Sequence, residues 1–430
     1  MAKKNSKQSF TRAGDVSIDK TVLISADGRA INIMGQLIGI DLYEDMFSPF
    51  ISGILYMRDA QNLVGVLPII GEEFLQLDFS TPQLGKKAKY SGTYAVIKLN
   101  DREKTAEREI IYALHFVSVE AVVDMNTKTS RAYEGYIHEI IKDIVPGKDG
   151  LQSQKQLIVE EATNRTKFIS NFWSPTKNIQ YACENATNKN NSPSFIFFEN
   201  KLGFNFVTLD LLYSKTEPDH YFRWDNYTAE VLPTGSSRKS LLEDYKRVLD
   251  LQSAGGFDYI KQLKSGMYGS EIIYFDLTTH QYVHTYYQPN WGEDRHLNPE
   301  PLWRNIAQRS APKSVLLFGK QYYNNFDGYS AETANTKVQQ KRESLLAQAE
   351  AFKVTINVYG SPLINAGQLV NLFIPAPAQL SAVQRKDKDM MDRVQSGNYL
   401  IGAVCHRINR KEYTCTIELI KDSYVTGIYE

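Results

Sequence analysis

Two histidines, His280 and His284, have the HxxxH spacing of paired metal ligands. On a helix, this spacing places both imidazoles on one face, where they can share a zinc ion. The pair lies in THQYVHTYYQ, whose threonine, valine and tyrosine content favours a strand, and residues i and i+4 of a strand lie about 13 Å apart. We therefore predict no metal site at this pair and no cofactor elsewhere.

Motifs that build other catalytic sites are absent from the sequence, including GxxxxGK[ST], a GxGxxG that opens a helix, GxSxG and CxxC. Three cysteines, Cys183, Cys405 and Cys415, are too few and odd in number for a disulfide framework. Cys405 and Cys415 flank a turn, and we interpret them as small buried apolar side chains rather than as a redox pair. The sequence thus predicts no catalytic residue and a protein that is not an enzyme.

An aromatic-rich stretch from Tyr268 to Trp303 allows two interpretations. Rings such as Tyr274, Tyr282 and Tyr286 fit cross-strand pairs in a core or interface, which is the interpretation that we favour. The alternative is a sugar-stacking platform in a tail-associated enzyme that degrades cell wall or polysaccharide. Carboxylate pairs for such chemistry are often distant in sequence, so spacing alone does not exclude them.

Composition indicates an ordinary globular protein of two to three domains. The 430 residues are 42% hydrophobic and 23% charged, and 49 basic residues balance 49 acidic ones. A net charge of zero provides no global attraction for nucleic acid or anionic lipid. Residues 1–20 are expected to form a flexible basic tail, because no apolar signal-peptide segment follows the basic residues. No stretch approaches the ~18 apolar residues of a spanning helix, and we expect synthesis in the cytoplasm.

The first half of the chain changes its periodicity once. Residues 21–125 read as short strands separated by turns, including Asp27-Gly28, which predicts a barrel or sandwich. In residues 126–213, apolar residues recur at helical spacing from Tyr133 to Ile144, and Ser174-Pro175 begins a second helix. A hairpin turning at 200–203 follows, so this part is predicted to be an inserted α/β domain.

The second half returns to β-structure. Residues 214–334 are predicted to be irregular, aromatic-rich β segments and loops that link to a second β-domain at 335–430. In that domain we expect a helix in TANTKVQQKRESLLAQAEA, a strand–loop–strand hairpin over 354–374 and a final hairpin over 399–420. The charged stretch RKDKDMMDR at 385–393 is interpreted as a solvated loop.

Three turn residues in the 354–374 segment are the only positions for which the sequence predicts a specific structural role. Gly360, Pro362 and Gly367 are expected to act through backbone geometry, because glycine tolerates positive φ and proline presets its own φ. The alternative is a permissive surface loop.

Several segments together resemble the baseplate hub proteins of contractile-tailed bacteriophages. These are FISGILYMRDAQNLVGVLPIIGEEFLQLDF, SPSFIFFENKLGFNF, VTINVYGSPLINAGQLVNLFIP and NYLIGAVCHRINRKEYTCTIELIKDSY, which follow one another in the expected order. The stretch 217–334 has no counterpart in this resemblance.

The resemblance implies a mainly β fold with an α+β insertion, in which two tail-tube-like β-barrels accompany an inserted α/β domain. It also implies a homotrimeric ring that joins the hexameric tail tube, or a tube-adaptor protein, to a trimeric central spike and encloses the DNA-exit channel. Tape-measure and baseplate wedge proteins are further candidate neighbours, and DNA would be only transient cargo. The expected location is the virion tail baseplate. The alternative that stays closest to this fold is the hub part of a type VI secretion or related contractile injection spike.

Overall fold

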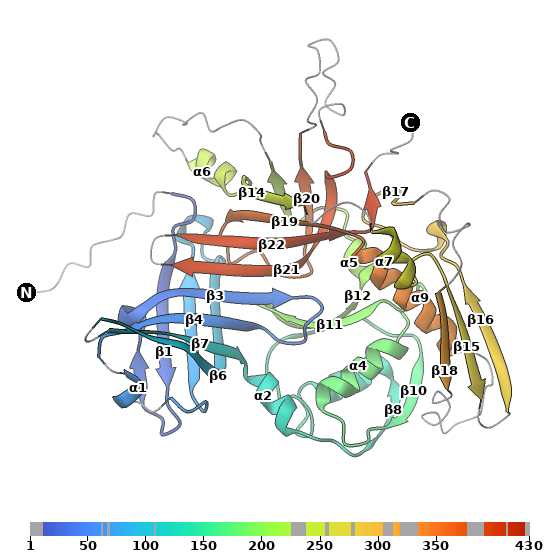
Figure 1. The fold of residues 1–430 in the computed structure, drawn as a ribbon, viewed down its shortest axis with the longest axis horizontal. Helices are drawn as coiled ribbons and strands as arrows, with labels where there is room; N and C mark the ends of the chain where they lie inside the picture. Colours follow the sequence, from blue (N-terminus) through green and yellow to red (C-terminus); the bar gives the residue numbers. More distant parts are fainter. Residues whose placement is uncertain are drawn as a thin grey trace, which may run out of the picture.

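The computed structural model describes residues 12–61, 63–66, 69–106, 109–224, 238–253, 258–276, 280–303, 313–318, 334–375, 391–409 and 412–425. Most of the predicted basic tail and residues 385–390 of the predicted charged loop lie outside these ranges. Among the described residues, 13 strands form one large, mainly antiparallel sheet that curves through the molecule (Figure 1).

This sheet connects strands from opposite ends of the chain. Its order is β14-β19-β22-β21-β3-β4-β7-β6-β5-β1-β2, with β20 pairing to β21 and β13 to β20. Strand β3 (Leu37–Asp45) pairs antiparallel with β21 (Gly397–Asn409), so that the two β-rich parts of the sequence share one ladder. We call β1 to β7 the first β unit, and β13, β14 and β19 to β22 the second β unit.

The first β unit owes its core to alternating strands. In β5 (Phe74–Ser80), Leu75, Leu77 and Phe79 are at most 1% exposed, which confirms the alternation read from the sequence. Gly28 turns between β1 and β2 with a φ of +83°. The remaining elements are β1 (Ser17–Ile24), β2 (Ala30–Asn32), η1 (Met34–Gln36), β4 (Ser52–Asp59), α1 (Leu63–Val66), η2 (Pro82–Leu84), β6 (Lys89–Ala106) and β7 (Glu109–Ser118).

The second β unit contains the predicted C-terminal hairpin, because β21 and β22 (Tyr413–Lys421), which follow one another in the chain, pair antiparallel. It also takes strands from the segment predicted as a link between domains. These are β13 (His220–Arg223), which runs parallel to β20 (Leu369–Phe373), and β14 (Val248–Ser253), which pairs with β19 (Phe352–Tyr359).

The hairpin predicted over 354–374 is wrong in its pairing, although both of its strands exist. Strand β19 pairs with β14 and β22, whereas β20 pairs with β13 and β21. Residues 360–368 therefore cross over the ends of two intervening strands, a distance of about 14 Å at the usual strand spacing. Alternation reports which face of a strand is buried, but it carries no information about which strand lies alongside.

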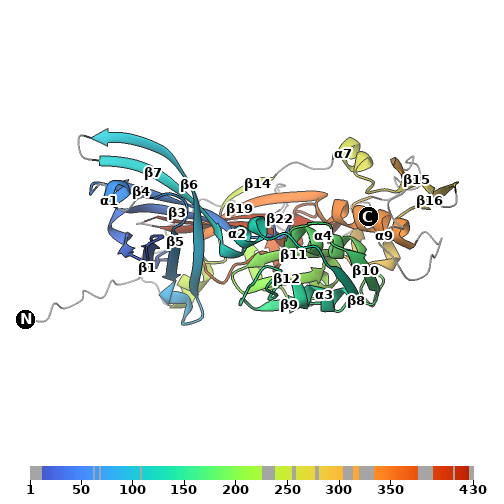
Figure 2. The same cartoon turned by 90° about the horizontal axis from the view of Figure 1, so that it is seen from below.

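The inserted unit, 119–213, packs helices against two small sheets (Figure 2). Helix α4 (Pro175–Asn185) begins as predicted, since the Ser174 Oγ accepts the Lys177 amide at 3.3 Å. The helix predicted from Tyr133 is wrong in its first part: residues 132–136 form β8, which pairs with β10, and the helix starts at Ile137. The elements are α2 (Val119–Asn126), β8 (Ala132–Tyr136), α3 (Ile137–Ile144), β9 (Leu157–Val159), β10 (Arg165–Ile169), β11 (Phe195–Asn200), β12 (Gly203–Thr208) and α5 (Leu209–Tyr213).

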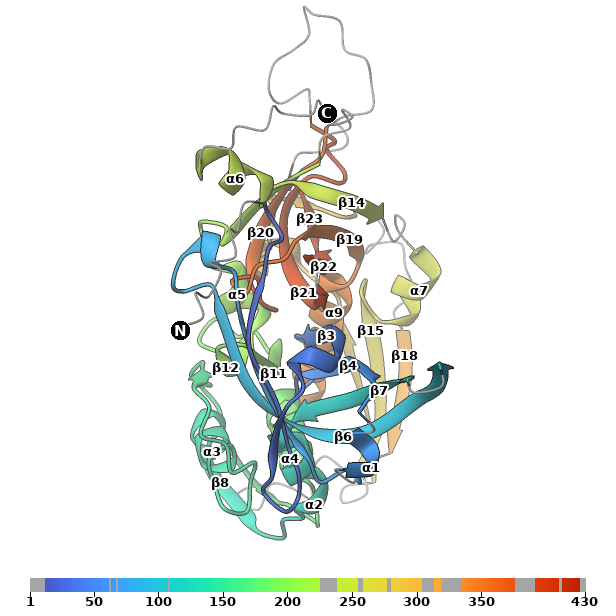
Figure 3. The same ribbon diagram turned by 90° about the vertical axis from the view of Figure 1, so that its left-hand side faces the viewer.

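Helix α9 (Ala334–Ala349) lies between the inserted unit and a separate three-stranded sheet (Figures 1 and 3). Gln340 of this helix donates to the carbonyls of Ser270 and Thr285 at 2.8 and 3.0 Å, which fixes the sheet to the helix. The other elements of this part are α7 (Tyr259–Lys264), β15 (Ser270–Asp276), β16 (Gln281–Tyr287), η3 (Trp291–Glu293), β17 (Glu300–Pro301), β18 (Lys313–Phe318) and β23 (Ser423–Tyr424). Helix α6 (Arg238–Asp244) lies apart from them, near β14 (Figure 1).

The aromatic stretch splits between the interior and the surface. Tyr268 and Trp303 are 5% and 6% exposed and contact each other edge to face, whereas Tyr282 and Tyr286 on β16 are 66% and 64% exposed. A core position is therefore wrong for these two tyrosines. His284 lies in β16, as the strand interpretation predicts, and its Nδ1 is 3.3 Å from a Glu271 carboxylate oxygen.

Candidate functional site

Residues 360–368, which contain the three predicted turn positions, lie buried where the two β units and the inserted unit meet. Ser361 and Asn365 are 5% and 4% exposed, and Ala366 is 1% exposed. The loop is closed on its own sheet by hydrogen bonds from the Gly360 amide to the Tyr413 carbonyl, at 2.8 Å, and from the Gly367 amide to the Ile401 carbonyl, at 2.9 Å.

The β11–β12 turn of the inserted unit holds this loop from one side. The Lys201 ammonium donates to the Pro362 carbonyl at 2.8 Å, and the Asn200 side-chain amide donates to the Ala366 carbonyl at 3.1 Å. These bonds satisfy two buried carbonyls. A buried carbonyl left without a hydrogen-bond partner would cost about 1–3 kcal/mol of stability. The turn and the loop therefore act as a single joint.

Glu44, near the end of β3, completes the joint from the first β unit. One carboxylate oxygen accepts the Lys201 backbone amide at 3.0 Å, and the other accepts the Ala366 amide at 3.1 Å. Burial raises the pKa of Glu44 to about 8, against the opposing effect of the two amides. One side chain thus connects the first β unit, the inserted unit and the 360–368 loop of the second β unit.

The glycines of the loop differ in what they provide. Gly367 has a φ of +84°, and a Cβ atom there would lie 2.7 Å from the Phe198 ring. At Gly360 a Cβ atom would lie 2.1 Å from the Tyr413 ring, so this position requires close approach rather than positive φ. The predicted geometric role of Gly360, Pro362 and Gly367 remains a prediction, which variants can test.

A second buried ionic group binds the inserted unit to the first β unit. Lys155 donates to Glu199 at 2.5 Å and to Glu120 at 2.6 Å, and Glu199 also accepts the Ile51 amide at 3.1 Å. Burial raises the pKa of Glu199, while Lys155 opposes this effect. Ser118 donates to Glu199 and Ser153 donates to Glu120, so Glu199 links β11 to β7, and Glu120 links α2 to the loop at 153–155.

A cysteine and a histidine lie side by side in the interior, as they do in cysteine nucleophile sites, but neither side chain is ionised. The Cys415 Sγ lies 3.2 Å from the His406 Nδ1, which is also 2.7 Å from the Tyr413 hydroxyl. Burial raises the pKa of Cys415 to about 12 and lowers that of His406 to about 3. The thiol and the imidazole are both neutral at pH 7, which does not fit an activated thiolate.

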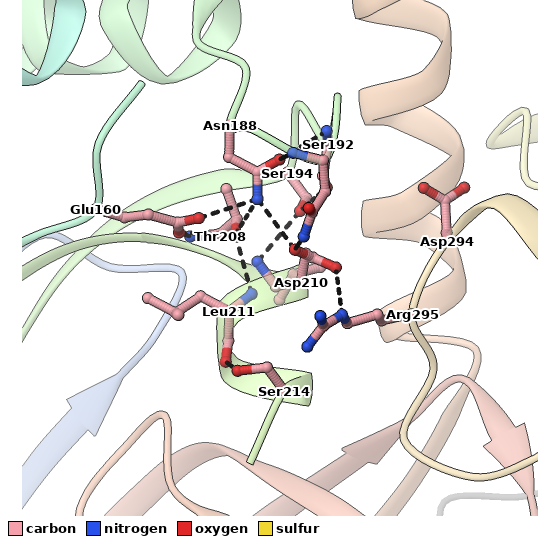
Figure 4. A network of polar contacts seen from close by, with 12 residues as sticks. Glu160, Asn188, Ser192, Ser194, Thr208, Asp210, Leu211, Ser214, Asp294 and Arg295 are labelled. Carbon is pink, nitrogen blue, oxygen red and sulfur yellow. Dashed lines mark hydrogen bonds and ion pairs between the residues drawn. The ribbon is translucent and has the colours of Figure 1, made fainter. Parts of the chain in front are cut away.

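A polar network closes the far end of the inserted unit (Figure 4). The Asn188 amide donates to Glu160 at 2.9 Å and to Asp210 at 3.1 Å, and Asp210 lies 3.5 Å from the Arg295 guanidinium. Next to it, Asp294 accepts Lys341 of α9 at 2.8 Å. The segment 291–298, from the part of the chain without a predicted role, therefore links α5 and α9.

The buried carboxylates of Glu44, Glu120 and Glu199 each accept hydrogen bonds from protein groups. Within the described ranges, no three histidine, cysteine, aspartate or glutamate side chains are placed to share a metal ion. Of the helices in those ranges, none has both the length and the hydrophobicity to span a bilayer.

Sequence reasoning missed Glu44, Lys155, Glu199 and Lys201. Their signal is weak but present, because Glu199-Asn200-Lys201 interrupts the apolar run SFIFF and Glu44 follows the apolar strand LIGIDLY. Charged residues that end apolar strands in this way can mark buried joints, yet nothing local tells them from solvated turn residues.

Comparison of the sequence with known proteins finds similarity to a phage protein. No family model matches the chain. The chain is 21% identical over 414 residues to the "Probable baseplate hub protein gp334" of Vibrio phage KVP40, and the match covers 92% of each protein.

Two solved structures share the fold across nearly the whole chain. One is the tail protein from Neisseria meningitidis MC58, with a TM-score of 0.54, 11% identity and coverage of 94% of this chain and 96% of that one. The other is the 43 kDa tail protein of prophage MuSo2 from Shewanella oneidensis, with a TM-score of 0.54, 10% identity and coverage of 94% and 99%. The predicted resemblance is confirmed: this chain is similar to a phage baseplate hub protein in sequence and has the fold of phage tail proteins.

Proposed function

We propose that the protein is the central structural hub of a contractile phage tail baseplate. The observation that carries this proposal is similarity to a baseplate hub protein over 92% of both chains, on a fold in which two β units share one sheet through β3 and β21. Buried joints at Glu44 and Lys155 suit a rigid adaptor, because they fix the inserted unit to both β units without providing a reactive group.

In the proposed assembly, three chains form a ring around the DNA-exit channel. Two β units per chain supply six units, which allows a threefold object to face a hexameric tail tube or tube adaptor while it keeps threefold symmetry for the central spike. Edge strands support ring closure: within the described residues, the ladder of β14 is with β19 alone, apart from the Arg223–Arg247 bridge directly before it, and the ladder of β2 is with β1 alone. An unpaired edge is an aggregation hazard unless another chain covers it.

Oligomeric state tests the proposal directly. Native mass spectrometry and light scattering of the 49.0 kDa chain, alone and after co-expression with the spike protein of the same particle, should show three copies per complex in at least one condition. A stable monomer in both conditions would contradict the ring.

The enzymatic alternative retains one specific observation, the exposed Tyr282 and Tyr286 on β16. Incubation of the pure protein with peptidoglycan and with surface polysaccharide tests it. We expect no soluble fragments, because the buried acids at the joints are occupied by protein partners. Fragment release in proportion to protein concentration would overturn the purely structural proposal.

A further inference from the structure

A groove of about 510 Å³ opens where α4, α9, β11 and the turn after β3 converge. Its floor is apolar and includes Ile179 of α4, Ile196 of β11 and Leu346 of α9, with Phe47 at its edge. Phe47 is 41% exposed. The volume lies within the roughly 300–1,000 Å³ of typical ligand sites.

The charged groups that line the groove are both cations, Lys177 and Arg342. The Arg342 Nη1 donates to the carbonyls of Pro193 and Phe195 at 2.8 and 2.5 Å, and no described carboxylate forms a salt bridge with the guanidinium. Burial lowers the pKa of Arg342, with Cys183 and Glu184 as the titratable groups that act on it. A desolvated cation without a direct counter-ion is costly, and a carboxylate brought by a ligand would reduce that cost.

Lys177, on the exposed side of the first turn of α4, also has no salt bridge among the described residues. The amides at this helix end are already occupied: Ser174 accepts the Lys177 amide at 3.3 Å, and Asp124 accepts the Thr176 amide at 2.6 Å. Asp124 also accepts the Thr176 hydroxyl at 2.6 Å, so its carboxylate is engaged. Recognition of an anion therefore falls to the side chains of Lys177 and Arg342.

Two exposed apolar residues are close in the chain to residues at the α4 end of the groove. Phe172, two residues before the N-cap of α4, is 75% exposed and has a φ of +52°. Met125, next to the Asp124 that holds Thr176, is also 75% exposed. Left-handed backbone at a non-glycine residue costs about 1–2 kcal/mol, so the fold presents Phe172 to solvent at a cost to stability.

We propose that this groove docks an acidic, apolar segment of a partner protein. One or two apolar side chains occupy the floor formed by Ile179, Ile196 and Leu346, and a carboxylate of the same segment meets Arg342 and Lys177. Complementary charge selects an acidic partner, and the exposed apolar surface around Phe47 and Phe172 selects one with apolar anchors. This proposal depends on the proposed hub function in one respect, which is that a hub protein contacts other proteins.

A synthetic probe tests this surface on the full-length protein. The probe is a fluorescein-labelled peptide of about twelve residues, with leucines at the i, i+3, i+4 and i+7 spacing of a helix that docks into a groove and glutamates elsewhere. Its counterpart replaces every glutamate with lysine. Fluorescence anisotropy should show binding of the acidic peptide with a Kd on the order of 10 µM, and binding of the basic peptide at least about tenfold weaker.

Surface variants locate the binding without disturbing the fold. Lys177→Glu and Phe47→Ser should each weaken binding of the acidic peptide by about tenfold or more. Lys142→Glu, which changes an exposed lysine of α3 on the same unit, should leave it unchanged. Equal binding of the two peptides, no binding of the acidic peptide at about 1 mM, or equal loss in Lys142→Glu would overturn the proposal.

The oligomeric state of the same samples separates this test from that of the hub function. The groove lies within one chain, so peptide binding by a chain that stays monomeric both with and without the spike protein would support the groove while contradicting the ring. Normal trimers without peptide binding would overturn the groove and leave the ring intact.

Discussion

The carboxylate of Glu44 and the backbone amide of Ala366 are 3.1 Å apart although 322 positions separate them in the chain. The other oxygen of Glu44 accepts the Lys201 amide, so one buried acid closes a joint between the first β unit, the inserted unit and the 360–368 loop. If the protein forms a ring, its shape depends on joints of this kind together with the shared β3–β21 ladder, because these contacts set the angle between the parts.

Replacement of Glu44 by glutamine should change how stability depends on pH. The folded-state pKa of about 8 lies above the ordinary 4.5, so the folded chain binds the extra proton between these values. The contribution of Glu44 is therefore complete below about pH 4.5 and decreases as pH rises through about 8. Glu44→Gln places an NH₂ group against one backbone amide, so it should be less stable than wild type by about 1–3 kcal/mol near pH 5, with a smaller difference near pH 8.

Urea unfolding at several pH values measures this difference, and Glu72→Gln, a change at an exposed acid, serves as the control. A variant whose stability follows the same pH slope as wild type would show that Glu44 does not hold the extra proton.

The glycines of the buried loop separate backbone strain from steric clash. Gly367→Ala should lose about 2–4 kcal/mol of stability, because it combines a positive φ with a Cβ 2.7 Å from Phe198. Gly28→Ala, at a similar φ of +83° with open space around it, should lose only about 1–2 kcal/mol.

Gly360→Val should be more damaging than Gly28→Ala through clash with Tyr413, although its φ is not positive. Gly35→Ala, with neither feature, is the neutral control. Thermal unfolding of the four variants gives the comparison. Unchanged melting temperatures for both Gly360→Val and Gly367→Ala would return the loop to the permissive alternative.

Removal of the Lys155 ammonium should lower the free energy of unfolding, because two buried carboxylates lose their counter-ion. Lys155→Met leaves Glu199 and Glu120 without their cation and should cost about 2–4 kcal/mol, less than a fully buried pair because Lys155 keeps 33% of its side chain in solvent. A second change, Glu199→Gln, should recover part of this loss, which denaturant unfolding of the double-mutant cycle measures. Lys142→Met is the matched control, and strictly additive losses would mean that Lys155 and Glu199 are not coupled.

Leu249, on the edge strand β14, tests how the sheet is covered in the assembly. It is 36% exposed in the single chain, so Leu249→Lys should alter monomer stability by no more than about 0.5 kcal/mol. If ring closure buries this edge, the same change should shift the population from trimer to monomer in native mass spectrometry. Leu202→Lys, at a 54% exposed leucine of the inserted unit, should leave the trimer intact. Equal trimer content in both variants would place the interface elsewhere.

Local residue patterns were enough to predict many of the helices and strands. Ser174-Pro175 marks the start of α4 because side-chain capping and a fixed proline φ act within four residues. The alternation around Cys415 predicts β22, and the turn residues at 409–412 predict its pairing with β21, because strands that are neighbours in sequence have little choice of partner.

Tertiary structure decided the rest, because it depends on contacts between distant residues. Strands β19 and β20 carry good alternation, yet their partners are chosen by the sheet as a whole, and two other strands lie between them. Residues 133–136 have apolar residues at helical spacing and still form β8, because pairing with β10 outweighs a weak local preference.

The buried position of Glu44 could not be predicted from the sequence either. A carboxylate at the end of a strand looks solvated in the sequence, and only packing of the β11–β12 turn and the 360–368 loop around it removes the water and raises its pKa. Local sequence thus determined most of the strands and helices, with β8 as an exception, whereas the buried charges and the shared sheet arose only from the way those segments pack together.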